Sequence, residues 1–490
     1  MKRDVVSRFC EIARAHPEHA AVVTTERGTC TYSALLRFAA TVRARVLEHS
    51  PKGGSIAIVA EQNELGYGAM LGALMAGRGY VPINPGHPPL LKKEIIEISE
   101  SSVVLAKGAG ANLTSDKCIA LDLERIWEEV DTTAELVDEV DLDFDESIGY
   151  TIFTSGSTGR PKGVQIFRHS LNCYVDWAVD AMKISTADRW SQHPNLGFDL
   201  SVLDVYGALC GGATLFPITS PADRLMPARL IKRERLTIWN SVPSVLDLLN
   251  RASQLNQDHL GSLRLATFCG EALYPRHLEW LFEANENLIV HNTYGPTEAT
   301  VSCTLVTLTV SNFTQFCRDT VALGDPIVGM KLRLDGRGNG SQGEIWLAGD
   351  QLSKGYLKRD EETQKLFVED KGERWYRTGD LAEEIDGQLY FLERLDNQVK
   401  VNGYRIELGA IAARVMKLTN LTAKVVLING RLCCFVENRG EPLELENLTA
   451  QLQSCSESYA VPEVFHEIAA FPRNQNDKID LKKLVEEYGD

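Results

Sequence analysis

The sequence contains no run of about 18 apolar residues, the length that a membrane-spanning helix requires. Its first twenty residues, MKRDVVSRFCEIARAHPEHA, carry charges through what would be the apolar core of a secretory signal peptide. The net charge is −16, so the chain has no excess of basic residues that would favour binding to phosphate backbones or anionic lipid headgroups. We therefore expect a cytoplasmic protein without membrane insertion and without nucleic acid as a partner.

The eleven cysteines form no CxxC pair and stand singly, apart from Cys433 and Cys434. Neither a zinc site nor a disulfide framework is therefore expected. We predict that most of the thiols are buried as small apolar residues. The chain also has no internal repeat and no low-complexity segment.

The 490 residues are too many for one compact core, so two or more domains are expected. Short apolar runs such as SIAIVA (55–60) alternate with segments of helical period such as ELGYGAMLGALMAG (64–77). This alternation predicts the α/β class, with parallel sheets covered by helices. After about residue 320, segments such as GEIWLAG and GQLYFLERLD predict a β-rich subdomain, and the last 95 or so residues predict a small α+β unit.

One polar stretch interrupts this pattern, in YTIFTSGSTGRPKGVQ (150–165). Residues 148–153 predict a buried strand, and the Ser, Thr and Gly residues begin at its carboxyl edge, where open α/β sheets bind ligands. Backbone N–H groups and hydroxyls of such a loop suit an oligophosphate, with Lys162 and Arg160 as cations. The Walker A pattern fails, because Lys162 stands between Pro161 and Gly163. Composition alone leaves a phosphate cradle and a flexible surface loop equally open.

The same stretch closely resembles the phosphate loop of the adenylate-forming superfamily, which contains acyl-CoA ligases, luciferases and the adenylation domains of nonribosomal peptide synthesis. Seven further blocks follow the family's order: YVPINP (80–85), GFDLSVLDVYGALCGGATL (197–215), FCGEAL (268–273), NTYGPTEATV (292–301), YRTGDL (376–381), ERLDNQVKVNGYRIEL (393–408) and NDKIDLKKL (476–484). The resemblance implies that a carboxylate attacks the α-phosphate of ATP to form an acyl-adenylate and pyrophosphate, and that a thiol then accepts the acyl group. The first step depends on charge neutralisation at phosphorus.

The resemblance implies a role for each residue at a matched position. Glu298 would ligate Mg²⁺ that bridges the phosphates, with a solvated surface carboxylate as the alternative. Asp380 would accept both ribose hydroxyls. Lys478, the catalytic residue, would join the substrate carboxylate and the α-phosphate as negative charge builds. The implied ATP-binding residues are Thr154, Ser155, Thr158, Lys162, Asn292, Thr293, Tyr294, Gly295, Pro296, Thr297, Asp380, Arg394 and Lys478.

Asp396 matches the family's hinge, about which a small lid domain swings between two poses. The expected division is therefore an N-terminal domain over residues 1–395 and a mobile C-terminal lid over 396–490. The chain departs from the family's pattern at two positions: Glu393 and Asp477 replace glycines, which restricts the backbone there.

Asp199 decides the expected substrate class. It falls where amino-acid activators keep an aspartate, and a buried carboxylate needs a cation, which the substrate's ammonium group would supply. The alternative is an aspartate that caps the following helix. The implied substrate-binding residues are Asp199, Leu200, Leu203, Cys269, Thr293, Val301 and Lys478, and the same alignment adds Asn240, Thr267 and Ser302 to the pocket lining.

Apart from Asp199 and Lys478, the expected lining contains no aromatic or charged side chain. A substrate with an aromatic or charged side chain is therefore disfavoured. FDLSVLD, FCGEAL and NTYGPTEATV resemble the D-alanine:carrier-protein ligases of cell-envelope modification and the ligases that load glycine for lipid A glycylation. This resemblance implies glycine or D-alanine as the substrate, with lipid A or teichoic acid modification as the purpose. Twelve residues follow Lys478, so the expected acceptor is the phosphopantetheine thiol of a separate carrier protein.

Three other functions stay open at this point. The first is a stand-alone nonribosomal adenylation enzyme for another neutral amino acid, such as proline, serine or alanine. The second is an acid:CoA ligase in which Asp199 is structural. The third is a nucleotide-binding sensor or scaffold without turnover, against which the retained Lys478, Asp380 and Glu298 argue.

Overall fold

The computed structural model describes residues 3–108, 113, 118–133, 147–154, 160–336, 341–396, 398–401, 404–438, 440, 442–473, 479 and 481–488. The chain forms two compact units. Unit 1 comprises Met1–Pro85, Ser99–Ile152 and Gly163–Glu393, and unit 2 comprises Gly86–Ile98, Phe153–Lys162 and Arg394–Asp490. Unit 2 therefore includes two earlier segments besides the end of the chain, and the domain boundary expected at residue 396 stays a prediction.

The largest sheet has nine strands, in the order β15-β14-β13-β12-β11-β9-β10-β1-β2. Its six central strands are parallel, and β2, β14 and β15 add antiparallel edges. The strands are β1 (Ala20–Thr24), β2 (Gly28–Thr31), β9 (Arg189–Gln192), β10 (Thr214–Pro217), β11 (Ile238–Ser241), β12 (Leu265–Phe268), β13 (Ile289–Tyr294), β14 (Thr304–Leu308) and β15 (Asp325–Pro326). The parallel centre places the carboxyl ends of β11, β12 and β13 at one edge.

The second sheet has seven strands, in the order β18-β8-β7-β4-β3-β5-β6. The strands are β3 (Ser55–Val59), β4 (Gly79–Ile83), β5 (Val103–Ala106), β6 (Ile119–Asp122), β7 (Ile148–Thr154), β8 (Lys162–Phe167) and β18 (Gly355–Tyr356). The buried strand predicted over 148–153 is β7, and the chain returns to the sheet as β8 directly after the polar loop. These two sheets confirm the α/β class.

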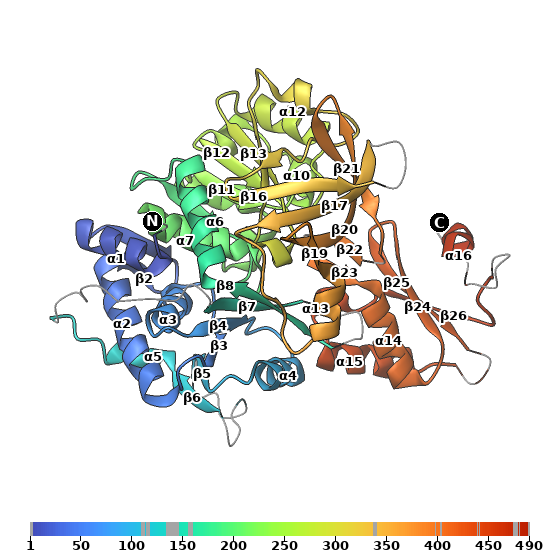
Figure 1. Ribbon diagram of the computed structural model, residues 1–490, viewed down its shortest axis with the longest axis horizontal. Coiled ribbons are helices and arrows are strands. Elements are labelled where there is room, and N and C mark those ends of the chain that lie inside the picture. The colour runs from blue at the N-terminus through green and yellow to red at the C-terminus, as the bar shows by residue number, and fades with distance from the viewer. Residues whose placement is uncertain are drawn as a thin grey trace. The chain divides into compact units, whose positions relative to one another are not determined.

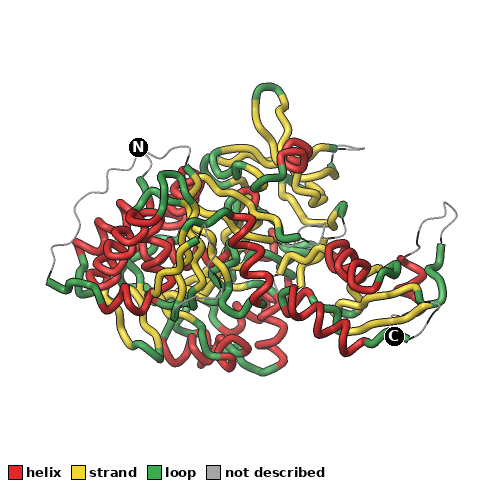
Figure 2. Tube along the Cα trace, turned by 90° about the horizontal axis from the view of Figure 1, so that it is seen from below, coloured by secondary structure: helices red, strands yellow, loops and turns green. Residues whose placement is uncertain are grey.

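Helices cover the sheets of unit 1, as Figures 1 and 2 show. The helices are α1 (Val5–Ala15), α2 (Tyr32–His49), α3 (Glu64–Met75), α5 (Leu123–Glu128), α6 (Arg168–Ala181), α7 (Leu200–Gly211), α8 (Pro221–Leu225), α9 (Pro227–Glu234), α10 (Ser244–Arg251), α11 (Gln257–Leu260), α12 (Pro275–Ala284) and α13 (Asp360–Leu366), with 3₁₀ turns η1 (Thr297–Ala299) and η2 (Phe313–Phe316). None of the helices in the described part of the chain combines the length and the apolar character that a membrane crossing requires.

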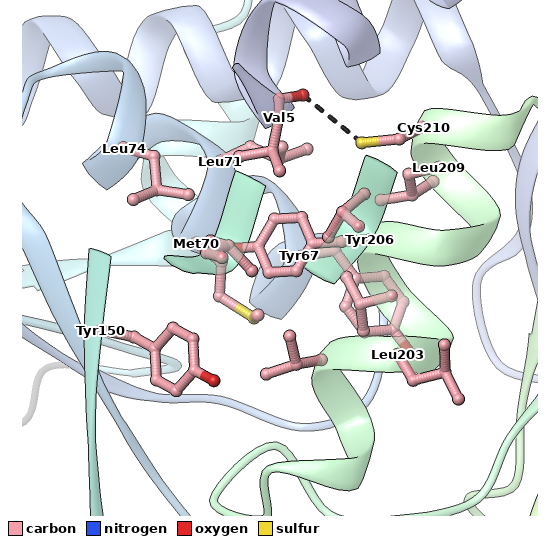
Figure 3. Packing of buried hydrophobic residues seen from close by; sticks show 14 of the residues in the cluster. Val5, Tyr67, Met70, Leu71, Leu74, Tyr150, Leu203, Tyr206, Leu209 and Cys210 are labelled. Carbon is pink, nitrogen blue, oxygen red and sulfur yellow. Dashed lines mark hydrogen bonds between the residues drawn. The ribbon is translucent and has the colours of Figure 1, made fainter. Parts of the chain in front are cut away.

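Helices α3 and α7 are central to the core. Every residue of α3 is buried, and so is every residue of α7 before its final glycine. Figure 3 shows their side chains in one apolar cluster with Val5 of α1 and Tyr150 of β7, and there the Cys210 thiol donates to the Val5 carbonyl at 3.4 Å. A helix that is apolar on all sides needs packing on all sides. The start of α7, which carries Asp199, is therefore fixed against the core.

A five-stranded sheet completes unit 1, as predicted for the region after about residue 320. Its strands are β16 (Met330–Asp335), β17 (Gln342–Gly349), β19 (Phe367–Asp370), β20 (Glu373–Ile385) and β21 (Gln388–Arg394). All eleven cysteines are free thiols, and all but Cys317 and Cys455 are buried, which confirms the prediction that most of the thiols are buried.

Unit 2 combines two small sheets with helices. A hairpin of β22 (Gln398–Val401) and β23 (Tyr404–Glu407) precedes a sheet of β24 (Ala423–Ile428), β25 (Arg431–Glu437) and β26 (Val464–Ile468). Its helices are α4 (Pro89–Ser99), α14 (Leu408–Thr419), α15 (Leu445–Cys455) and α16 (Leu481–Tyr488), with the 3₁₀ turn η3 (Ser458–Ala460). The α+β character expected for the end of the chain is confirmed.

Candidate active site

Asp199 lies directly before α7, at the N-cap position. Its backbone has helical dihedral angles (φ −61°, ψ −32°), and its side chain makes no capping hydrogen bond. The carboxylate instead accepts a hydrogen bond of 2.6 Å from the Thr297 hydroxyl, 98 residues further along the chain. The alternative of a helix-capping aspartate is therefore wrong. Two blocks that the sequence analysis treated separately, FDLSVLD and NTYGPTEATV, meet at this bond.

The segment after Thr297 has a strained backbone. Thr300 and Val301 both have positive φ angles, of 56° and 68°. Such angles are unfavourable for β-branched residues and persist only where the surroundings impose them. The Thr300 hydroxyl donates to the Gln351 carbonyl at 2.7 Å, which holds the turn in place. Gly295 is needed beside this turn, because a Cβ there would lie 2.7 Å from the Ser302 Cα.

The turn brings Val301 and Ser302 against the end of β12. The Cys269 thiol lies 3.7 Å from the Ser302 hydroxyl and 3.9 Å from the Val301 carbonyl. Ser302 donates to the Thr293 hydroxyl at 3.3 Å, and Thr293 donates to the Phe268 carbonyl at 3.2 Å. The structure thus gathers four of the residues expected in the pocket lining, and all four are buried.

The remaining expected lining lies on α7 and on the sheet. Leu200 and Leu203, on the first turn of α7, are both buried. Asn240 of β11 and Thr267 of β12 are register partners on adjacent parallel strands, and neither is exposed. Side chains of register partners point to the same face of a sheet.

Sequence reasoning missed Asp204, although it stands in the quoted FDLSVLD. Asp204 is fully buried in α7, and its Oδ1 accepts from Trp190 Nε1 at 3.1 Å and from Asn240 Nδ2 at 2.9 Å. Burial raises the pKa of Asp204 well above its usual range, although these hydrogen bonds act in the opposite direction. An acidic residue within an apolar helical run was the signal that could have identified it.

Asp380, expected at the ribose, is buried in β20. Its Oδ2 accepts a hydrogen bond of 2.7 Å from the hydroxyl of Tyr294, which ends β13. Burial and then the charge of Asp380 raise the pKa of Tyr294 well above its usual range, so the phenol stays a donor. Asn292, on the same strand, donates to the Ala322 carbonyl at 2.8 Å. Asn292 and Tyr294 thus lie on the strand that also supplies Thr293 to the expected pocket lining.

Glu298, the expected Mg²⁺ ligand, lies in η1 with none of its surface exposed. Its Oε1 accepts from the Tyr356 hydroxyl at 2.8 Å, so the alternative of a solvated carboxylate is wrong. Among the described residues, no three His, Cys, Asp or Glu side chains gather to hold a metal by themselves. A single buried carboxylate fits Mg²⁺ held mainly by phosphate oxygens and water, for which it supplies one hard ligand. Bound there, the ion would neutralise phosphate charge. Tyr356 was not found from sequence, since nothing local links it to Glu298.

Seven expected site residues lie in unit 2, and the structure describes four of them. The Thr154 hydroxyl donates to the Lys162 carbonyl at 3.5 Å, across the polar loop, and Lys162 is buried at the start of β8. Arg394 binds both carboxylate oxygens of Asp396, each at 2.7 Å. Burial acts to raise the pKa of Asp396, but Arg394 lowers it below its usual value. The predictions for Ser155, Thr158 and Lys478 fall outside the described residues.

Known proteins are similar to this chain along nearly its whole length. The family model described as AMP-binding enzyme matches residues 9–357. The chain is 31% identical over 504 residues to a D-alanine–D-alanyl carrier protein ligase of Staphylococcus aureus (strain JH9), and the match covers 99% of each protein.

Two solved structures are similar in fold. The Vibrio cholerae adenylation domain AlmE, in complex with glycyl-adenosine-5'-phosphate, matches 99% of this chain and 97% of its own at 25% identity, with a TM-score of 0.85. An NRPS protein containing adenylation and PCP domains, bound to a vinylsulfonamide inhibitor, matches 99% of this chain and 84% of its own at 25% identity, with a TM-score of 0.83.

Proposed function

The chain belongs to the AMP-binding enzyme family, and from this premise we propose that it activates a small amino acid, glycine or D-alanine, as the aminoacyl-adenylate. The family membership and the ligase relatives make it an AMP-forming ligase. ATP is the proposed co-substrate, with Mg²⁺ as the cation and pyrophosphate as the leaving product. The aminoacyl group would then pass to the phosphopantetheine thiol of a separate carrier protein.

The bond between Thr297 and Asp199 carries the proposal of an amino-acid substrate. The bond places a half-buried carboxylate beside the residue expected at the phosphates. A carboxylate removed from water is costly without a cation, and the ammonium group of an amino acid is a cation of suitable size. A fatty acid or aryl acid has no such group, so Asp199 would oppose its binding.

The Asp199 contact also suggests how the two substrates cooperate. The Thr297 hydroxyl donates a hydrogen bond to Asp199. The ammonium group of a bound amino acid would be a stronger donor to the Asp199 carboxylate oxygen than the Thr297 hydroxyl is. The Thr297 hydroxyl could then turn toward a phosphate oxygen. A bound amino acid would therefore increase the affinity for ATP, and by thermodynamic linkage bound ATP would increase the affinity for the amino acid.

The proposed chemical step depends on positioning and charge. Glu298 would hold Mg²⁺ against the phosphates, and Asp380 with Tyr294 would fix the ribose. Lys478 would donate to the substrate carboxylate and to the α-phosphate as the new bond forms, where negative charge increases. The carboxylate oxygen attacks phosphorus, the bond to the pyrophosphate oxygen breaks, and pyrophosphate leaves.

The proposed choice among amino acids and the proposed acceptor draw on the relatives. The first relative is named for D-alanine and a carrier protein, and AlmE is bound to a glycyl adenylate. The uncharged and non-aromatic lining residues support a substrate without a charged or aromatic side chain. We propose cell-envelope modification, of lipid A or teichoic acid, as the purpose.

ATP–pyrophosphate exchange tests the proposal. The panel contains glycine, both enantiomers of alanine, serine and proline, and a fatty acid, each with ATP and Mg²⁺. Exchange should be fastest with glycine or D-alanine. Exchange driven only by the fatty acid would contradict amino-acid activation, and no exchange with any acid would support a nucleotide-binding protein without turnover.

A further inference from the structure

The buried carboxyl group of Asp204 has no role in the proposed adenylation chemistry. It lies on α7 among apolar residues, with none of its surface exposed. A leucine could occupy this position without the cost of burying a carboxyl group. The carboxyl instead accepts two side-chain hydrogen bonds at one oxygen, from Trp190 Nε1 at 3.1 Å and from Asn240 Nδ2 at 2.9 Å, and a backbone hydrogen bond from His193 acts on it as well.

The second of these bonds fixes the orientation of the Asn240 amide. Because Asp204 Oδ1 accepts, the nitrogen of the amide must face it, and the oxygen must face the other way. That oxygen, Asn240 Oδ1, is buried and has no hydrogen-bond partner among the described residues. The same is true of the Thr267 hydroxyl, which lies on the same sheet face in the neighbouring register position. Two adjacent buried polar atoms without partners indicate a third group that bonds them.

The place of this pair along α7 relates it to the proposed substrate. Asp204 follows Asp199 by five residues, a rise of about 7.5 Å along a helix. With the ammonium group at Asp199, a substrate side chain of one or two heavy atoms would extend toward this depth. Strand β12 runs on from Thr267 to Cys269, beside Ser302 in the expected lining. Asn240 and Thr267 thus lie at the floor of the proposed side-chain space.

We propose that Asp204 is a positioning residue that makes this floor a hydrogen-bond acceptor: it holds Asn240 so that Oδ1, together with the Thr267 hydroxyl, binds a hydroxyl group of the substrate or a water molecule in its place. The inference rests on the proposed amino-acid activation and extends it to a substrate class. A small amino acid whose side chain ends in a hydroxyl is selected over one of equal size that ends in a methyl. Glycine and D-alanine leave this position to water.

Serine and 2-aminobutyrate are the matched substrate pair, because they differ by a hydroxyl in place of a methyl. Exchange of pyrophosphate into ATP is measured with each, in both enantiomers, and kcat/KM is compared. We expect serine to exceed 2-aminobutyrate by about tenfold in the wild-type protein, as a site with a buried unpaired acceptor rejects the analogue that cannot fill it. In Asp204→Leu the ratio of kcat/KM for serine to that for 2-aminobutyrate should fall to about two or less. The fall should come from a higher KM for serine, and the KM of ATP should stay unchanged.

Two variants separate positioning from a general structural effect. Asp204→Asn keeps an oxygen that accepts both hydrogen bonds and should restore the ratio. Trp190→Phe removes the other side-chain donor and should leave the ratio as in the wild type. If Asp204→Leu does not fold, Asp204→Ala, which leaves space for a water, provides the same readout.

Each remaining outcome would overturn the proposal. A wild-type ratio near one, with glycine or D-alanine active, overturns the role of Asp204 and leaves amino-acid activation intact. The role of Asp204 is also overturned if Asp204→Leu and Asp204→Ala leave the ratio unchanged. It is overturned as well if Trp190→Phe lowers the ratio as much as Asp204→Leu does. If none of the amino acids supports exchange, the proposed function and this inference are both wrong.

Discussion

Replacing Asp199 by alanine removes the only group assigned to the substrate's ammonium ion. The structure predicts a selective loss of amino-acid affinity, because the carboxylate is half-buried and accepts a hydrogen bond of 2.6 Å from the neutral hydroxyl of Thr297. A hydrogen bond to a charged group contributes about 1.5–3 kcal/mol. The expected rise in the KM of the amino acid is therefore about 10–150-fold.

Asparagine at position 199 is the matched control, because it keeps an oxygen that can accept from Thr297 but carries no charge. Both Asp199→Asn and Asp199→Ala should raise the KM of the amino acid. Only Asp199→Ala leaves the Thr297 hydroxyl without this acceptor, so only the alanine variant should change the stability of the turn around Thr297, by about 1 kcal/mol.

The assay is ATP–pyrophosphate exchange with alanine and with propionate, which lacks the amine. Wild type should discriminate strongly for alanine, and both variants should lose that discrimination, because propionate gains nothing from the carboxylate. A wild-type preference for alanine that survives in Asp199→Ala would refute recognition of the amine by Asp199. An equal loss of affinity for ATP and for alanine would indicate damage to the fold instead.

Three further predictions concern other residues. Lys478→Ala should slow adenylate formation by about 10²–10³-fold while ATP binding persists, because the charge that Lys478 stabilises develops during the reaction. Single-turnover pyrophosphate release measures the first quantity, and equilibrium ATP binding measures the second. An equal loss of both would contradict this role. Tyr356→Phe removes the donor to Glu298 and should raise the Mg²⁺ concentration for half-maximal rate about tenfold, and an unchanged Mg²⁺ titration would argue against Glu298 as the ligand. Burial acts to raise the pKa of Asp188, but hydrogen bonds, first from Arg264, lower it below 3.8. This group therefore stabilises the fold above that pH and loses its contribution as pH falls through the lowered pKa; Asp188→Asn should flatten the acid limb of a melting-temperature profile, and an unaltered limb would count against it.

The sequence predicted those features that local patterns determine. The strand β7, followed by the polar loop and the return to β8, was predictable because an apolar run and a Ser/Thr/Gly segment have distinct compositions. The burial of nine of the eleven cysteines was expected because unpaired thiols usually pack as small apolar residues. The β-rich region after residue 320 was predictable from short alternating strands and polar turns.

Partnerships over long separations were not predictable in the same way. Thr297 and Asp199 are 98 residues apart, and Glu298 and Tyr356 are 58 apart, so no local period connects them. Asp199 was open to interpretation as a helix cap, since a cap and a ligand-binding aspartate occupy the same position in sequence. Asp204 was missed because helical spacing does not reveal that Asn240 and Trp190 meet it across the sheet.

A crystal structure of the chain bound to its aminoacyl-adenylate tests the amine-recognition claim most directly. The account predicts the ammonium nitrogen within about 3.2 Å of an Asp199 carboxylate oxygen, with the Thr297 hydroxyl turned toward the phosphate. An ammonium group bound elsewhere, with the bond from Thr297 to Asp199 intact, would contradict it.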